Sequence, residues 1–344
     1  MPEKTRTGPL LAVEKLSKHY TVGKRLFGGG GVALRAVDGI SFHINRGETF
    51  GLVGESGCGK STAGKAILRL VEPTAGSVRL DGVEITALSR RALHEQRRNM
   101  QAIFQDPFAS LNPKMTAAAI VNEPFVNYRL FSRRERAQRV AALFARVGLR
   151  PDHMRRYPHE FSGGQRQRLG IARALALEPK LVIGDEPVSA LDLSVQAQVI
   201  NLMVRLQEEL GLSYLFIAHD LAVVRHISDR IAVMYLGRIV ETASARILFA
   251  TPAHPYTRML LASVPSAGSR GRERRRMVLR GEPPSPLSPP SGCPFHPRCP
   301  EAVTRCRVET PLLREVGAGH LASCHLAGGV ALETATGPEA GATG

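Results

Sequence analysis

The feature that most constrains this chain is a glycine-rich loop between an apolar strand and a helix. The loop reads Gly-Glu-Ser-Gly-Cys-Gly-Lys-Ser, directly after a buried strand predicted over residues 49–53 and at the start of a helix predicted over 60–70. Glycines let backbone N–H groups curl around phosphate oxygens, and the helix N-terminus adds positive potential. The pattern predicts a nucleotide phosphate site made of Gly54, Glu55, Ser56, Gly57, Cys58, Gly59, Lys60, Ser61 and Thr62.

A second apolar strand, predicted over 181–185, ends in two acids, Asp185 and Glu186. A carboxylate in this place can hold Mg²⁺ together with the Ser61 hydroxyl, while Lys60 reaches the β- and γ-phosphates. Glu186 then lies where it can orient or deprotonate an attacking water. A strand ending in Asp-Glu is unspecific alone, but beside the phosphate loop it predicts hydrolysis of a nucleoside triphosphate.

The order of the predicted elements indicates an α/β fold. Strands are predicted at residues 10–16, 40–44, 49–53, 100–104, 181–185, 214–218 and 231–235, and helices at 60–70, 162–177 and 193–210. Their alternation is typical of a mainly parallel sheet covered on both faces. Residues 115–148 are helical and basic without a strand pattern, which predicts an inserted helical subdomain. Eight prolines between 282 and 300 exclude a helix or central strand there.

Charge and hydropathy restrict the class of partner. The chain has 46 Lys and Arg against 30 Asp and Glu, a net charge of +16, which suits nucleotide phosphates, nucleic acid or an anionic membrane face. Basic side chains on solvated helix faces are the alternative explanation for this excess of positive charge. The longest uncharged apolar stretch, 210–218, is far shorter than the roughly 18–20 residues of a membrane helix. Without a signal-peptide pattern, the sequence predicts a cytoplasmic chain.

Further motifs lie in order along the chain. Ser-Gly-Gly-Gln immediately precedes the helix of 162–177, and Gln105 and His219 each follow a predicted strand. Each is weak alone, but together with the phosphate loop and the acid pair they make the chain resemble an ATP-binding-cassette (ABC) ATPase, with its signature motif, Q-loop and H-loop. Asp192 matches the family's D-loop. Tyr20 matches the aromatic residue that stacks on adenine, although the glycine-rich stretch 23–31 lengthens the spacing between Tyr20 and the phosphate loop.

This resemblance implies a role for each matching residue. Catalysis would use Glu186, His219 and Gln105. Magnesium would be held by Ser61, Gln105 and Asp185, and ATP by the phosphate loop, Tyr20 and Asp185. In the family, the signature of one subunit closes the ATP site of another; the residues expected at that contact are Ser162, Gly163, Gly164, Gln165 and Asp192.

The resemblance also implies the domain organisation. The fold class would be α/β, an ABC-type P-loop domain with a mainly parallel core, an antiparallel β subdomain and a helical subdomain. The ATPase domain is expected over 8–264, with its helical subdomain at about 107–165. A proline- and cysteine-rich region would follow at 265–327, and 328–344 reads as a disordered tail because it is rich in Gly, Ala, Thr and Glu.

The resemblance extends further, to the ATPases of bacterial oligopeptide and dipeptide importers. It rests on residues 54–62, 105–113 and 157–162, on His-Pro-Tyr-Thr at 254–257, and on Gly-Cys-Pro-Phe-His-Pro-Arg-Cys-Pro at 292–300. Cys58 and the early glycine insertion are more similar to the second, F-type ATPase of the pair. One departure is Gly184, where a bulkier residue is common; it could loosen the strand end by roughly 0.5–1 kcal/mol.

The resemblance implies partners and a location. A heterodimer with a second ATPase would work on two permease subunits at the cytoplasmic face of the plasma membrane, supplied by an extracytoplasmic solute-binding protein. Peptides are the expected cargo, with nickel and glutathione left open. A soluble ABC ATPase acting on nucleic acid is the alternative; such proteins usually carry two cassettes or a long coiled coil, and neither pattern is present, so no nucleic acid is expected. A non-hydrolysing subunit would lack Glu186 or His219.

Four cysteines form a separate pattern, with spacing C-x5-C-x6-C-x17-C at Cys293, Cys299, Cys306 and Cys324. Disulfides are disfavoured in a reducing compartment. Structural zinc sites usually have pairs of cysteines separated by two to four residues, and none of these gaps is that short. Thiolates in a proline-stiffened segment can instead hold an iron–sulfur cluster. The resembled ATPases carry such cysteines as ligands of a [4Fe-4S] cluster. Free thiols in a compact loop region remain the alternative.

Overall fold

The computed structural model describes residues 8–23, 31–263 and 282–328. The strands are β1 Leu11–Val22, β2 Val32–Ile44, β3 Thr49–Val53, β4 Ala75–Leu80, β5 Val83–Glu84, β6 Met100–Ile103, β7 Leu181–Asp185, β8 Ser213–Ala218, β9 Arg230–Tyr235, β10 Arg238–Ser244, β11 Arg314–Gly317 and β12 His320–Ala322. The α-helices are α1 Lys60–Ile67, α2 Arg90–Gln96, α3 Pro107–Ser110, α4 Ala117–Asn127, α5 Arg133–Arg146, α6 Gly163–Leu175, α7 Leu193–Leu210, α8 Leu221–Ile227, α9 Ala245–Ala250, α10 Pro255–Ala262 and α11 Thr304–Val308. Short 3-10 turns occupy Arg97–Asn99, Pro151–Arg155, Pro158–Glu160 and His296–Arg298.

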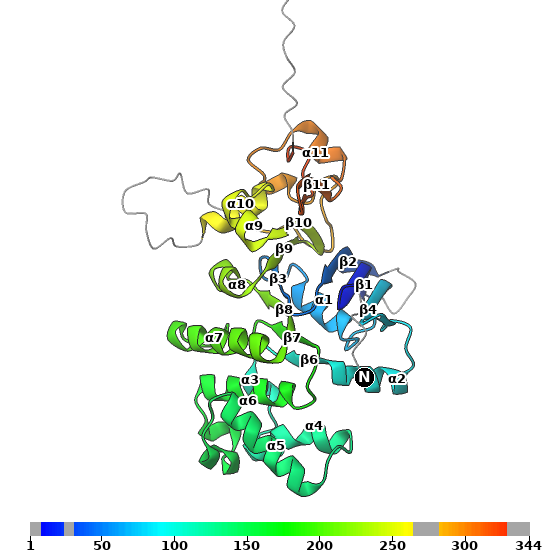
Figure 1. Cartoon of the computed structure of the whole chain (residues 1–344). Coiled ribbons are helices and arrows are strands. Elements are labelled where there is room, and N and C mark those ends of the chain that lie inside the picture. Colours follow the sequence, from blue (N-terminus) through cyan, green and yellow to red (C-terminus); the bar gives the residue numbers. More distant parts are fainter. Residues whose placement is uncertain (1–7, 24–30, 264–281, 329–344) are drawn as a thin grey trace, which may run out of the picture.

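Two sheets carry the fold. The larger has the order β11-β12-β10-β9-β3-β8-β7-β6, and its strands from β9 to β6 are parallel. The smaller, β2-β1-β4-β5, is antiparallel and lies beside α1 (Figure 1). A mainly parallel core with an antiparallel subdomain is the predicted fold class, which is therefore confirmed.

The pleat of the central strands divides the core between two faces. Val182 and Phe216 point into one apolar cluster, which α6, α7 and α8 complete. Their neighbours Ile183 and Ile217 point into a second cluster, shared with α1 and the strands of the smaller sheet. Successive side chains on a strand point to opposite faces, so an unbroken apolar strand needs cover on both sides. The predicted two-sided cover is confirmed.

The helical subdomain lies at one end of the molecule, where α4, α5 and α6 pack together (Figure 1). A capping box starts α5, in which the Ser132 side chain accepts from the Glu135 N–H and the Glu135 carboxylate accepts from the Ser132 N–H. The predicted helix of 60–70 ends earlier, at Ile67, because Arg69 has a left-handed φ of 50° that stops the helix. Among the described residues, none of the helices has the length and apolar character to cross a bilayer.

The C-terminal region contributes to the main sheet, which the sequence analysis did not predict. β12 pairs antiparallel with β10, and β11 pairs with β12. His320 Nε2 lies 2.7 Å from the fully buried Glu241 carboxylate, which also accepts from the N–H groups of Ala253 and His254. These contacts fix the C-terminal strands to the ATPase core. The arginine-rich stretch 270–280 and most of the predicted tail at 328–344 lie outside the described residues.

Candidate active site

The phosphate loop connects β3 to α1 as predicted. Gly59 has a φ of 107°, and a Cβ there would lie 2.0 Å from the Ala36 carbonyl oxygen, so no larger residue fits. The buried Lys60 donates from Nζ to the carbonyl oxygens of Gly54, at 2.7 Å, and Glu55, at 2.9 Å. The lysine ammonium therefore lies over the loop, with Ser61 and Thr62 on the first turn of α1.

Four adjacent strands bring the predicted residues to one edge of the sheet. In the order β3-β8-β7-β6 these strands are parallel, so their carboxyl ends meet at the same edge. The phosphate loop follows β3, His219 follows β8, Glu186 follows β7, and Gln105 lies two residues past β6. Residues spread over more than 160 positions thus become neighbours.

Hydrogen bonds join three of these residues directly. Gln105 Nε2 donates to Glu186 Oε2 at 3.1 Å, and His219 Nδ1 lies 3.1 Å from the same oxygen. Glu186 has a left-handed φ of 49°, and its N–H donates to the Ile217 carbonyl oxygen. Strained backbone of this kind gathers at functional sites, because the surroundings must hold it in place. The predicted catalytic trio forms a single cluster.

Asp185 and Ser61 face each other beside this cluster. Ser61 Oγ donates to Asp185 Oδ1 at 2.7 Å. Burial raises the pKa of Asp185, while the hydrogen bond from Ser61 and the charge of Lys65 lower it. A half-buried carboxylate paired with a hydroxyl supplies the hard oxygen donors that Mg²⁺ prefers, and the cation would offset the cost of burying the charge. The residues present therefore fit the predicted magnesium site.

The signature residues lie at the start of α6. Ser162 caps this helix, accepting from the Gln165 N–H, while Gln165 Oε1 accepts from the Ser162 N–H. A Cβ on Gly164 would lie 2.4 Å from Val195 Cγ1, so this glycine lets α6 pack closely on α7. Ser162 and Gly163 are exposed. The hydrogen bonds of Ser162 stay within the first turn of α6, so its exposed side is free of contacts with the rest of the described chain.

Two predicted residues have other contacts in this chain. The Asp192 carboxylate caps α7, accepting from the Val195 N–H at 3.0 Å and the Ser194 hydroxyl at 2.8 Å. Tyr20 lies on β1 with 37% of its surface exposed, and the Lys18 ammonium is 4.8 Å from its ring centre. Their roles toward ATP stay predictions.

Two contacts to the phosphate loop are not predictable from the sequence. The Glu55 N–H donates to the Tyr256 hydroxyl at 2.9 Å, and the Glu55 carboxylate forms a bidentate ion pair with Arg298 at 2.7 and 3.0 Å. Tyr256 and Arg298 lie in the segments 254–257 and 292–300, which carry part of the family resemblance. No spacing rule connects them to a loop some 200 residues earlier, so only the fold reveals the contact.

The four C-terminal cysteines share one region but do not form a recognisable metal centre. Cys293, Cys306 and Cys324 are buried, and the Cys293 N–H donates to the Cys306 carbonyl oxygen. Burial raises the pKa of Cys293, and that of Cys299 to about 11. Across the described residues, no group of three or more His, Cys, Asp or Glu side chains is arranged to hold a metal ion. The thiols as placed do not fit a cluster.

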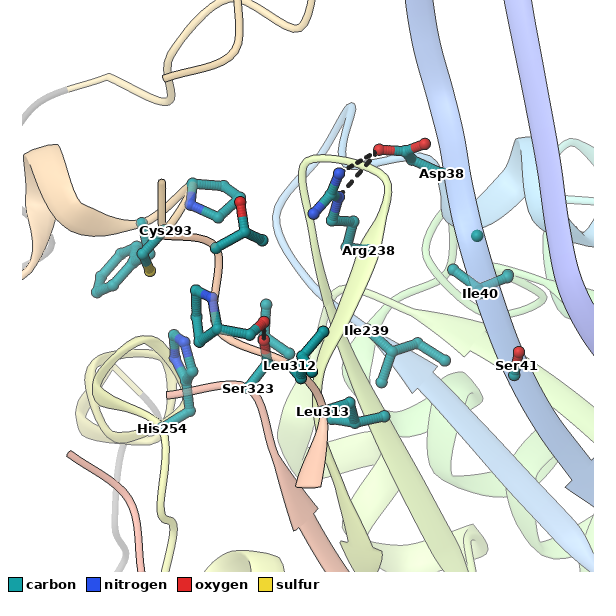
Figure 2. Close-up of a pocket in the computed structure, with 16 residues that line it drawn as sticks. Asp38, Ile40, Ser41, Arg238, Ile239, His254, Cys293, Leu312, Leu313 and Ser323 are labelled. Carbon is teal, nitrogen blue, oxygen red and sulfur yellow. Dashed lines mark hydrogen bonds and ion pairs between the residues drawn. The ribbon is translucent and has the colours of Figure 1, made fainter. Parts of the chain in front are cut away.

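A cavity of about 380 Å³ adjoins this region rather than the phosphate loop (Figure 2). It lies between β2, β10 and the C-terminal segments, with Cys293, His254 and Leu312 on its walls. An ion pair between Arg238 and Asp38, with N–O distances of 2.9 and 2.7 Å, lies at its rim. The cavity is thus separate from the cluster around Glu186.

Comparison with known proteins places the chain in a family. Residues 37–189 match the ABC transporter family, and 240–306 match the C-terminal region of oligopeptide/dipeptide transporters. The oligopeptide transport ATP-binding protein AppF of Bacillus subtilis is 53% identical over 92% of this chain and 97% of its own length. A probable peptide ABC transporter ATP-binding protein of Sinorhizobium fredii is 52% identical, covering 92% and 90%.

This chain is an ABC transporter ATP-binding subunit. Solved ABC structures agree with its fold. A dimeric cassette in a post-hydrolysis state, bound to ADP and Pi, has a TM-score of 0.61 and 30% identity, covering 69% of this chain and 99% of that one. A cassette from Clostridium perfringens, part of an ABC transporter complex, has a TM-score of 0.62 and 30% identity, covering 71% and 91%. ATP binding and hydrolysis follow from this membership.

Proposed function

We propose that this ABC ATPase energises the uptake of peptides across a membrane. The observation that carries the proposal is the meeting of Gln105, Glu186 and His219 at the sheet edge next to the phosphate loop. The peptide cargo is supported by the C-terminal region and by relatives that are named as peptide transport proteins. The match to that C-terminal region also favours transport over an ATPase that acts on nucleic acid.

Binding of ATP uses the residues of the loop. The N–H groups at the start of α1 and the Lys60 ammonium would contact the phosphates, with Lys60 exchanging its carbonyl partners for phosphate oxygens. Ser61 and Asp185 would hold Mg²⁺, which neutralises charge on the β- and γ-phosphates when bound. Tyr20 is proposed to stack on adenine.

Hydrolysis requires a water aligned with the γ-phosphate. Glu186 would accept a proton from this water, while His219 and Gln105 hold the carboxylate in place through their contacts with Oε2. Most of the rate enhancement would then come from positioning and charge stabilisation, as in phosphoryl transfer generally. Gln105 also connects the site to the helical subdomain through the segment that leads into α3.

A second ATPase is proposed to complete each site. The exposed Ser162 and the N–H groups at the start of α6 form an anion-binding end that could close over the γ-phosphate of a partner. The dimeric state of the similar cassette supports this arrangement. We propose a heterodimer, peripheral to the cytoplasmic face of the plasma membrane, with two permease subunits and an extracytoplasmic solute-binding protein.

The isolated chain should show weak ATPase activity. One signature per subunit can complete a site only across an interface, so turnover per subunit should rise with protein concentration and rise further when the partner ATPase and permease are added. Steady-state phosphate release against concentration measures this. High turnover that does not depend on concentration would contradict the dimer proposal.

The transport proposal is tested in liposomes that contain the assembled transporter. Peptide with its solute-binding protein should increase ATP hydrolysis, and labelled peptide should accumulate inside only when ATP is present on the ATPase side. ATP hydrolysis that responds to no peptide but to DNA or RNA would support the nucleic-acid alternative instead. Nickel and glutathione serve as the competing cargo.

The cysteines carry a separate proposal, an iron–sulfur cluster, which rests on their resemblance to family ligands alone. Because the thiols as placed are not arranged to hold a metal, binding a cluster would require them to move together. Anaerobically purified protein should contain iron and acid-labile sulfide and absorb visible light, and Cys299→Ser should reduce all three. Cys58→Ser, in the phosphate loop, should leave the iron content unchanged. Stoichiometric zinc, or absence of metal while residues 290–325 stay folded, would disprove it.

A further inference from the structure

The contact between Arg298 and Glu55 links the C-terminal region to the phosphate loop. Arg298 ends the 3-10 turn His296–Arg298, and only 5% of its side chain is exposed. Its two terminal nitrogens lie 2.7 and 3.0 Å from the two carboxylate oxygens of Glu55. Paired, parallel hydrogen bonds of this kind fix both position and orientation, which a single contact does not.

Aromatic side chains hold this contact on the C-terminal side. The Arg298 guanidinium lies 5.9 Å from the Tyr235 ring centre, and Phe295 packs edge-on against Tyr235 at 5.3 Å. Tyr256 packs against both rings, 4.7 Å from Tyr235 and 5.3 Å from Phe295, and its hydroxyl accepts from the Glu55 N–H. Phe295 and Tyr256 are almost fully buried. The C-terminal half of the chain therefore holds both the backbone and the side chain of Glu55.

Glu55 is itself bonded to the lysine that reaches the phosphates. Its carbonyl oxygen accepts from Lys60 Nζ at 2.9 Å. The contacts run without a break from Arg298 through Glu55 to Lys60. The arginine also neutralises a carboxylate within the loop, which would otherwise repel a triphosphate in a partly buried setting where water screens charge less.

We propose that Arg298 is a positioning residue through which the C-terminal region sets the ATP affinity of the phosphate loop. This inference rests on the proposed binding of ATP by that loop. Arg298 acts through Glu55 and does not itself contact the nucleotide. Coupling between two sites is reciprocal, so ATP binding must in turn stabilise the contact that Arg298 makes.

The test compares variants of the full chain. We expect Arg298→Ala to raise the Kd for MgATP about tenfold, the size expected for loss of a charge-assisted hydrogen-bonded pair. In the assembled transporter, KM for ATP should rise similarly while kcat changes less than about twofold, because the residues around Glu186 are untouched. Arg298→Lys, which keeps the charge but loses the fork geometry, should recover part of the affinity.

Two further variants separate positioning from general stability. Arg305→Ala removes an exposed arginine of the same region, paired with Glu309, and should leave the Kd unchanged. In a Glu55→Gln background, Arg298→Ala should have a much smaller effect, since the carboxylate it neutralises is gone. Should Arg298→Ala unfold, Arg298→Lys still decides the matter: it keeps the charge, loses the fork geometry and is expected to weaken binding, so a wild-type Kd in Arg298→Lys would overturn the inference.

Amide hydrogen exchange tests the reciprocal effect. MgATP should slow exchange over residues 293–299 in the wild type and have less effect in Arg298→Lys. An unchanged Kd in Arg298→Ala, or equal slowing in both proteins, would overturn the inference while leaving ATP binding intact. Wild-type ATP affinity in Lys60→Ala would instead overturn the proposed phosphate site, so the two failures can be told apart.

Discussion

Replacing Glu186 by Gln should abolish turnover and leave ATP binding intact. Gln keeps the shape and can still hydrogen bond to His219, but it cannot accept a proton. Loss of a general base costs about 10²–10⁴-fold in rate. Because ATP then stays bound, the variant should accumulate as an ATP-bound dimer with its partner. Single-turnover phosphate release and size-exclusion chromatography with MgATP measure the two effects.

The control for this variant is Glu208→Gln, an exposed carboxylate on α7. It should hydrolyse ATP at the wild-type rate and form no trapped dimer. Near-wild-type phosphate release by Glu186→Gln in the assembled complex would remove Glu186 from the role of base. The left-handed φ of 49° at this position is a property of the backbone, so Gln faces the same strain and stability should change little.

Replacing Lys60 by Ala should act earlier, on ATP binding itself. The ammonium supplies charge-assisted hydrogen bonds, each worth about 1.5–3 kcal/mol, so the Kd for MgATP should rise by about 10- to 100-fold. Fluorescent nucleotide titration measures it. Lys180→Ala is the matched control. Lys180 directly precedes β7, at the opposite end of that strand from Asp185, and its ammonium pairs with Asp81. Unchanged binding in Lys60→Ala would contradict the assignment of the loop.

The sequence predicted the site better than it predicted the sheet. Each residue proposed to be catalytic follows a short apolar strand, and the ends of parallel strands meet at one edge, so the meeting of Gln105, Glu186 and His219 follows from local patterns. The pairing of Ser61 with Asp185 follows in the same way. The order of the strands in the sheet could not be predicted from local patterns, because neighbouring strands such as β3 and β8 are far apart in the chain.

Some missed strands had a local signal. Asp81 and Gly82 separate β4 from β5, and both have positive φ, 52° and 80°, as a two-residue hairpin turn requires. Leu236 and Gly237 do the same between β9 and β10. β1 extends beyond its predicted end because its register shifts at several points, which interrupts the alternation that would reveal it.

The contacts of the C-terminal region had no such signal. Arg298 lies in a proline-rich segment without periodicity, and its partner Glu55 is 243 residues away. Burial of a charged pair over that separation depends on the finished fold. Nothing in residue spacing distinguishes Arg298 from the many surface arginines of this basic chain.

The pairing of β12 with β10 determines where this protein can be cut. Glu241 is wholly enclosed, and the region beyond residue 264 supplies its histidine partner and covers the edge of β10. An expression fragment that stops at residue 264 would leave a buried carboxylate without that partner and a strand edge open to pairing with other chains. Residue 264 is therefore an unsuitable end for an expression fragment. A shorter version of the chain has to extend through the buried Ala327, whose carbonyl oxygen accepts from Arg314.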